Sequence, residues 1–168
     1  MVKCKRNKTA KSATINKYQS IMSQILNDPE MQKSKDFVQH GDVSVYSHSV
    51  GVAEYSCRFA EALSKLGVKF DYHSLVRGAL LHDFFRYDWH DDWDLLHGFK
   101  HPRIALENAD KHFSLNKKER NIIRKHMWPM TFANIPTCRE AWVVCAVDKY
   151  CSLLETFKIF KYNYHDNT

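Results

Sequence analysis

The sequence predicts an all-α fold, a bundle of six to seven helices. Apolar residues recur at intervals of three and four along most of the chain, which is the spacing of one face of an α-helix. Only five glycines and four prolines occur in 168 residues, too few for the closely spaced turns of an all-β sandwich. The hydrophobic content of 44% indicates a folded chain with a sizeable core rather than a disordered one.

The N-terminal part of the chain predicts a helix, a second short helix and a turn. Apolar side chains between Ile15 and Leu26 share one helical face, so we expect a helix over Thr14–Asn27. Asp28-Pro29 interrupts this pattern, and a short helix is expected after it. The triplet His40-Gly41-Asp42 is typical of a turn.

A long helix is expected over Val43–Leu66. Gly67 supplies its C-terminal stop, because glycine readily adopts the left-handed conformation found just past helix ends. Asp71 is expected to cap the next helix, which ends near His82-Asp83. The apolar face of the long helix comprises Val45, His48, Val52, Tyr55, Phe59, Ala62 and Leu66.

The second half of the chain predicts three more helices separated by loops. Trp128-Pro129 ends the second of these helices, because proline disfavours the helical conformation in the residue before it. In chain order we expect a loop or broken helix over Arg86–Gly98, helices over Pro102–Phe113 and Asn116–Met127, a loop over Met130–Pro136 and a last helix over Thr137–Phe160.

The chain shows no internal repeat, low-complexity linker or break in composition, so residues 14–168 are expected to form one domain. Residues 1–13 are expected to be a basic, flexible tail that holds most of the formal net charge of +6. A solvated tail is favoured over one that binds nucleic acid, because the rest of the chain is close to neutral.

Neither a secretory signal nor a membrane span is apparent. No apolar segment follows the basic N-terminal residues, and no window approaches about 18 consecutive apolar residues. The five cysteines are odd in number and form no C-x-x-C pair. We therefore expect reduced thiols in a cytoplasmic protein without a membrane partner.

Histidines and aspartates interrupt the predicted apolar faces at six positions. Any single buried histidine has an ordinary explanation, an imidazole that hydrogen-bonds a backbone carbonyl. Buried carboxylates are harder to explain, because an unpaired charge in the core costs several kcal/mol. Imidazole and carboxylate are both suitable ligands of divalent metals, so a shared metal accounts for the whole set, provided the fold brings its members together. The six are His48, His82, Asp83, His101, His126 and Asp148.

The segments around these residues resemble the HD-domain metal-dependent phosphohydrolase superfamily, in particular its binuclear members with six ligands. "YSHSVGVAEYSCRFA" resembles the first-histidine helix and "GALLHDFFR" the HD signature, with Arg86 where many members carry lysine. "KHPRIAL" and "IRKHMW" resemble the two further histidine segments, and "CAVDKYCS" the closing aspartate segment. The resemblance covers about Val43–Glu155 and implies an HD-domain helical bundle.

The resemblance also implies a site for two divalent metal ions, with Fe, Mn, Zn, Ni, Co and Mg all open. It implies hydrolysis of a phosphate ester by a metal-bound hydroxide, with a nucleotide or another small phosphorylated compound as substrate. One ion is expected to take His48, His82, Asp83 and Asp148, and the other Asp83, as a bridge, with His101 and His126.

The expected catalytic residues are Asp83, Arg86 and Lys149. Arg86 can contact a non-bridging phosphate oxygen through its forked donors, or it can form a surface ion pair with Asp88 or Asp91; neither alternative is preferred. By analogy with the family, Lys149 assists substrate binding or the leaving group. The alternative is that its side chain points to solvent.

The loop expected over Arg86–Gly98 is rich in aromatic and acidic residues. Its aromatic side chains and that of Phe99 suit either a packed lid or a surface that stacks on a nucleotide base. These side chains are Tyr87, Trp89, Trp93 and Phe99. His97 competes with His101 as a metal ligand, and His101 is preferred because it opens a helix. Trp128, just past His126, is expected to line the pocket. The candidate substrate-binding residues are Arg86, Trp89, His90, His97, Trp128 and Lys149.

The resemblance leaves three functions open. The first is hydrolysis of a phosphate ester, the second is oxygen chemistry at a mixed-valent di-iron centre with the same ligands, and the third is a non-catalytic nucleotide-binding module. The presence of all six ligands counts against the third. Fold does not select the substrate, and these ligands do not select one metal.

Overall fold

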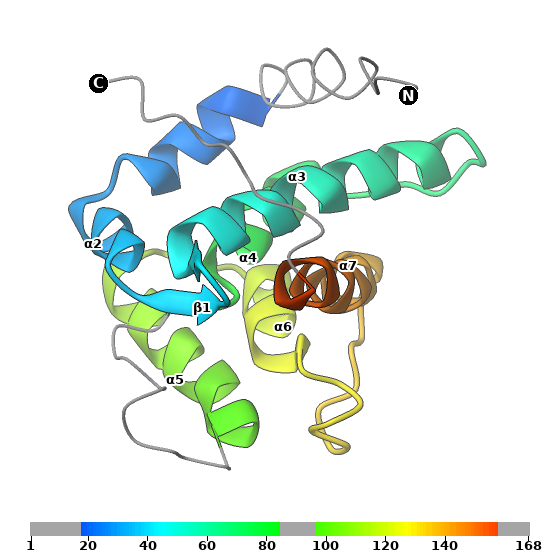
Figure 1. Ribbon diagram of the computed structural model, residues 1–168. Coiled ribbons are helices and arrows are strands. Elements are labelled where there is room, and N and C mark those ends of the chain that lie inside the picture. The colour runs from blue at the N-terminus through cyan, green and yellow to red at the C-terminus, as the bar shows by residue number, and fades with distance from the viewer. Residues whose placement is uncertain (1–17, 85–96, 158–168) are drawn as a thin grey trace, which may run out of the picture.

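The computed structural model describes residues 18–84 and 97–157 of the chain (Figure 1). Residues 18–26 are helical and lead into the following elements: α2 (Pro29–Gln32), η1 (Lys33–Lys35), β1 (Val38–His40), β2 (Val43–Ser44), α3 (Val45–Ser64), α4 (Tyr72–Leu81), α5 (His97–His112), α6 (Lys117–Lys125) and α7 (Arg139–Thr156). The predicted all-α class is confirmed, with one small antiparallel pair of strands as its exception.

Four helices form the centre of the fold. Helix α3 packs against α4 and α7, and α6 packs against the same two helices, while α5 lies against α6 (Figure 1). Their facing sides bury a single core of aliphatic and small side chains. Because each of the four helices has two or more neighbours, each one contributes side chains to the middle of the bundle.

The strands β1 and β2 form a hairpin that the sequence did not predict as strand. Val38 pairs with Ser44 across the turn that was expected at His40-Gly41-Asp42. Gly41 has a φ of 58°, in the left-handed region that glycine enters without steric penalty. The turn was therefore predicted and its two flanking strands were missed, because each strand is too short to show the alternation of a half-buried sheet.

Helix α3 begins two residues later than predicted and buries a different set of side chains in its second half. The Ser44 hydroxyl accepts a hydrogen bond from the Ser47 backbone at 3.2 Å and so caps the helix. The predicted inward positions Phe59 and Leu66 are exposed, whereas Cys57 and Ala60 are buried. Small residues face inward because α3 lies close to α4 on one side and to α7 on another.

The predicted stop of α3 and start of α4 are both confirmed. Gly67 has a φ of 88°, and the backbone N–H of Val68 donates to the Leu63 carbonyl at 3.2 Å, which closes the helix end. The Asp71 carboxylate then accepts from the backbone N–H of Ser74 at 3.1 Å as the cap of α4.

The predicted start of α5 at Pro102 is wrong by five residues, since the helix begins at His97. Proline lacks the N–H that would bond to the carbonyl four residues before it, so it was taken as the first residue of the helix. Here Pro102 lies inside the helix, in its second turn, where its position removes only the bond to Gly98.

Helices α4 and α6 make an unusually close contact at Gly78. A Cβ atom added at this glycine would lie 2.5 Å from Cδ1 of Ile122 and 3.0 Å from its Cβ and Cγ2. Gly78 and Ile122 each precede a buried histidine by four residues, His82 on one helix and His126 on the other. The missing side chain therefore sets how near the two helix ends come to each other.

A buried acidic side chain connects the starts of α4, α6 and α7. Glu140 accepts hydrogen bonds from the Asp71 backbone N–H at 2.8 Å and from the Lys118 ammonium at 3.2 Å. Burial alone would raise the pKa of Glu140, but these hydrogen bonds lower it below the ordinary value of a glutamic acid. The carboxylate therefore stays ionised in the folded chain at neutral pH.

Within the described ranges, no helix is long and apolar enough to cross a lipid bilayer.

We expect Gly78→Ala to lower the free energy of unfolding by about 1–3 kcal/mol. The overpacking against Ile122 outweighs the gain of about 0.5–1 kcal/mol that alanine brings to a helix interior. Urea denaturation of wild type, Gly78→Ala, Ile122→Ala and the double variant measures this coupling. In the Ile122→Ala background the added methyl group should cost clearly less, and an equal cost in both backgrounds would show that the contact is not the cause.

We expect Glu140→Gln to destabilise the fold by about 1–3 kcal/mol at pH 7, because hydrogen bonds to a charged acceptor are lost. The folded-state pKa of Glu140 lies below its unfolded value, so this stability is present above the unfolded pKa of about 4.3 and disappears as the pH falls through the folded pKa. The free energies of unfolding of the two proteins should therefore differ at pH 7 and approach each other at about pH 3. The exposed Glu107→Gln serves as the matched control, with no such difference expected at either pH.

Candidate metal centre

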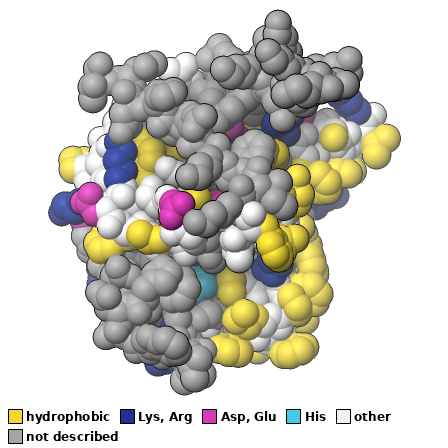
Figure 2. Space-filling model, viewed as in Figure 1, with side chains coloured by type: hydrophobic (Ala, Val, Ile, Leu, Met, Phe, Trp, Pro, Cys, Tyr) yellow, Lys and Arg dark blue, Asp and Glu magenta, His cyan; other side chains and the backbone are white. Residues whose placement is uncertain are grey.

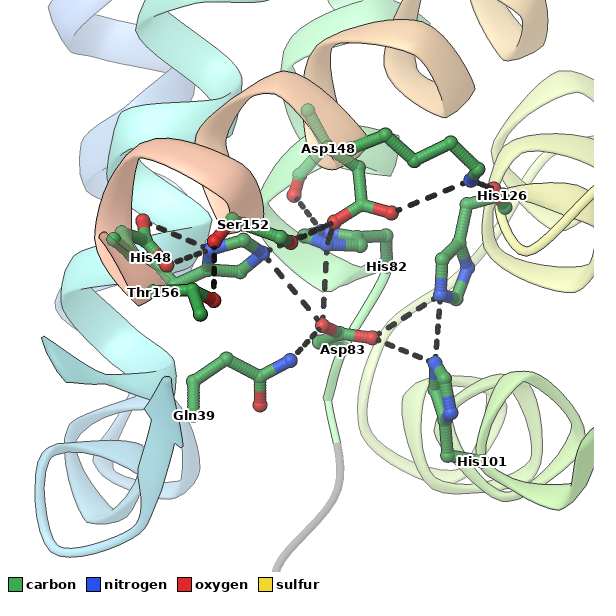
Figure 3. Close-up of polar contacts among 12 residues, drawn as sticks. Gln39, His48, His82, Asp83, His101, His126, Asp148, Ser152 and Thr156 are labelled. Carbon is green, nitrogen blue, oxygen red and sulfur yellow. Dashed lines mark hydrogen bonds and ion pairs between the residues drawn. The ribbon is translucent and has the colours of Figure 1, made fainter. Parts of the chain in front are cut away.

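Six buried polar side chains converge at the centre of the four-helix arrangement, on the side where α5 lies (Figure 3). Each comes from a different helix or helix end, apart from the two that follow one another at the end of α4. All are at most 5% exposed. They are His48 from α3, His82 and Asp83 from the end of α4, His101 from α5, His126 from the end of α6 and Asp148 from α7.

The first cluster brings together the side chains from α3, α4 and α7. The His48 Nε2 atom lies 3.2 Å from Asp148 Oδ1 and 3.8 Å from Asp83 Oδ2. The His82 Nε2 atom lies 3.3 Å from Asp83 Oδ2 and 3.6 Å from Asp148 Oδ1. Two imidazole nitrogens and two carboxylate oxygens thus surround one point.

The second cluster uses the other oxygen of Asp83. The Oδ1 atom lies 3.2 Å from His101 Nε2 and 3.2 Å from His126 Nε2, and these two nitrogens are 2.8 Å apart. The carboxylate of Asp83 therefore belongs to both clusters, one oxygen facing each (Figure 3).

Backbone carbonyls at two helix ends orient the imidazoles of His82 and His126. His82 Nδ1 donates to the Ala79 carbonyl at 2.7 Å, and His126 Nδ1 donates to the Ile123 carbonyl at 2.8 Å. The last carbonyls of a helix lack intrahelical partners, so they are free to accept these hydrogen bonds. With Nδ1 protonated, the Nε2 atom of each neutral ring presents a lone pair to the cluster.

Two further side chains support the clusters, and the sequence did not predict either one. Both oxygens of Glu155 accept from His48 Nδ1, at 3.0 and 2.9 Å, and Gln39 Nε2 donates to Asp83 Oδ2 at 2.6 Å. Glu155 lies two helical turns after Asp148 on the inward face of α7, a signal that could have identified it. Gln39 lies on β1, and nothing in the sequence pattern marks it.

The electrostatics of the site favour ionised carboxylates. Burial alone would raise the pKa of Asp83 and of Asp148, but the neighbouring imidazoles hold both pKa values well below the usual range. Burial lowers the pKa of His48, yet hydrogen bonds to Asp148 and Glu155 raise it to about 9. Cations are therefore needed beside these carboxylates, either protonated imidazoles or metal ions.

The donor atoms fit metal ions in geometry and in chemistry. Ligands at about 2.1 Å from a tetrahedral or octahedral ion lie about 3.0–3.4 Å from one another. The contacts given above span 2.8–3.8 Å, and all donor atoms of each cluster lie within 4.8 Å of one another. His82 Nε2 and Asp83 Oδ1 are buried without a hydrogen-bond partner, as expected of atoms that face an ion. Each cluster is a group able to hold one metal ion.

Lys149 has structural contacts at the edge of the site. Its ammonium group donates to the His126 backbone carbonyl at 2.7 Å and lies 3.8 Å from Asp148 Oδ2. The side chain is 40% exposed, so it connects α7 with the end of α6 while part of it faces solvent. Its predicted roles in substrate binding and catalysis stay predictions.

Of the remaining candidate substrate-binding residues, only Trp128 has a side chain among those that the structure describes. The indole of Trp128 packs edge-on against Trp142, with ring centroids 5.0 Å apart, and its predicted place at the pocket stays a prediction. Arg86, Trp89 and His90, with Tyr87, Asp88, Asp91 and Trp93, lie outside the described residues, as does the side chain of His97. His101 lies in the second cluster. The alternative, that His97 is the metal ligand in its place, is untested.

Comparison with known proteins gives one match. A family model described as HD domain matches residues 45–153, more than half of the chain and a span that contains all six clustered residues. No curated protein and no solved structure matches the chain.

We expect the protein to bind about two divalent ions per chain and His101→Ala to bind about one, because the substitution removes a ligand of the second cluster only. His48→Ala should likewise leave about one ion, in the second cluster. Elemental analysis after incubation with Mn²⁺ or Fe²⁺ and removal of free metal measures this. The exposed His73→Ala, on α4, is the matched control and should keep the wild-type content. Equal metal content in wild type and His101→Ala would contradict the second site.

Proposed function

The chain belongs to the HD-domain family, and from this premise we propose that it is a metal-dependent phosphohydrolase that acts on a nucleotide or another small phosphate ester. The proposal includes the six clustered residues as ligands of two ions, with Asp83 as the bridge. The observation that carries it is the position of the Asp83 carboxylate, whose two oxygens face two separate groups of imidazoles.

The charge of the site supports an anionic substrate. Two divalent ions bring four positive charges, and the carboxylates of Asp83, Asp148 and Glu155 bring three negative ones. The imidazoles bind metal in their neutral form and add no charge. An excess of positive charge in a buried site favours binding of a phosphate group.

When bound, a pair of such ions lowers the pKa of water and stabilises negative charge on phosphoryl oxygens. The chain itself orients the ligands for this. Glu155 fixes the ring of His48 through Nδ1, and Gln39 fixes one oxygen of Asp83. Such outer contacts raise the basicity of a ligand and hold its direction.

Two cationic side chains, Arg86 and Lys149, are proposed to contact the substrate. Arg86 follows Asp83 by three residues, and its planar guanidinium suits a non-bridging phosphate oxygen. Lys149 follows Asp148, and its side chain is 40% exposed, so we also propose that it stabilises a leaving group. A nucleotide is proposed as substrate because the segment before α5 is rich in aromatic residues.

Turnover by the metal-loaded protein tests the function. Under anaerobic conditions, we expect release of inorganic phosphate or a nucleoside monophosphate from a panel of phosphate monoesters and diesters. Asp83→Ala should lower kcat/KM by about 10³-fold or more, because both ions lose a ligand. Asp110→Asn, which removes only a surface partner of Arg120, is the matched control and should retain activity.

Two other outcomes would replace this function. If product forms only with oxygen and oxygen is consumed, the site performs oxidation at a di-iron centre. If both the wild type and Asp83→Ala bind nucleotides and neither hydrolyses any phosphate ester, the domain is a binding module.

A further inference from the structure

Helix α7 has two very different faces. Its inner face carries Asp148 and Glu155, both buried in the site. Its outer face is apolar and exposed, from 42% at Trp142 to 66% at Phe157. We call this the α7 outer face, and it consists of Trp142, Ala146, Tyr150, Leu153 and Phe157, spaced at intervals of three and four.

The α7 outer face lacks the charges expected of a solvent-facing helix. Between residues 141 and 156, none of the exposed positions of α7 is charged. The half-buried Lys149 turns back to the His126 carbonyl. A helix face that is apolar and free of charges is typical of a face that is covered, but the described residues place no cover over the outer side of α7.

Neighbouring segments extend the apolar surface. Trp142 contacts Trp128 at the start of the loop before α7, and Tyr150 contacts Tyr55 of α3, with ring centroids 5.9 Å apart. The same loop and the same helix expose Met130, Phe132, Ile135 and Phe59. We call these four residues with the α7 outer face the apolar flank. Figure 2 shows hydrophobic side chains gathered along this flank of the molecule, below the end of α3.

The size of the flank matches one half of a stable protein interface. Eight of its side chains are large and from 42% to 81% exposed, so each offers on the order of 100 Å². Together they offer roughly 800 Å², which is the area that each partner buries in an interface of standard size. The largest apolar patch on a typical monomer is about 300–600 Å².

We propose that the apolar flank is the interface of a homodimer, with a second copy of this chain as its occupant. An isologous contact uses the same surface patch on both copies, and a patch without exposed charges meets itself without repulsion. Trp142, Tyr150 and Phe157 supply the aromatic anchors on which interfaces depend. A membrane is less suited, because interfacial helices place several lysines or arginines beside the apolar face. Lys149 is the only one in residues 141–156, and its ammonium group is held by the His126 carbonyl.

Analytical ultracentrifugation of the full chain over about 1–100 µM tests the dimer, with Leu153→Glu as the interface variant. We expect wild type to sediment as a dimer and Leu153→Glu to dissociate at least about 100-fold more readily, because the substitution buries an unpaired charge. Leu66→Glu is the matched control, since Leu66 is 80% exposed in the turn after α3 but lies outside the flank, and it should remain dimeric. If Leu153→Glu does not unfold cooperatively and is therefore misfolded, Tyr150→Lys serves as the second interface variant.

A wild type that stays monomeric at the highest concentration would overturn the proposal, and so would a dimer that both flank variants preserve. Co-sedimentation with phosphatidylcholine vesicles distinguishes a lipid occupant. A monomer that binds vesicles through Leu153 would replace the dimer with a membrane surface. Metal content should be unchanged in Leu153→Glu, so loss of the dimer is measured separately from loss of the metal site.

Discussion

The buried carboxylate of Asp83 is the constraint on which the rest of the structure depends. An unpaired charge at this depth would cost several kcal/mol, so the fold must surround it with groups that stabilise it. Imidazoles from α3, α4, α5 and α6 lie within 4 Å of its oxygens, and Gln39 from the hairpin donates to one of them. One side chain thereby accounts for the convergence of elements that are far apart in the sequence.

The ends of two helices orient the imidazoles that surround this carboxylate. His82 and His126 follow the last residues of α4 and α6, where free carbonyls accept from their Nδ1 atoms and turn Nε2 inward. The Lys149 ammonium group donates a hydrogen bond to a third carbonyl, that of His126 at the end of α6. The core of this domain is therefore built around polar groups, and the apolar packing of α3, α4, α6 and α7 holds them in register.

The parts of the site that sequence reasoning located are those where periodicity carried the signal. His48 and Asp148 interrupt apolar rows on long helices, and a polar residue in such a row must find a partner inside. Gln39 lies on a strand of three residues, too short for any period, so its contact with Asp83 depends on tertiary structure alone. Phe59 fitted the helical period but faces outward, because small residues pack where α3 meets its neighbours. Periodicity shows that a helix has an apolar side, but not how many sides are covered.

The contact between Gly78 and Ile122 has a consequence for how this protein tolerates change. Neither residue touches the clusters, yet the absent side chain lets α4 and α6 approach until the rings of His82 and His126 lie 4.9 Å apart. The distance between the two imidazoles thus depends on Gly78, a residue without a reactive side chain. A side chain added at position 78 should therefore push the two helix ends apart and shift both imidazoles, and a search guided by reactive side chains would overlook this position.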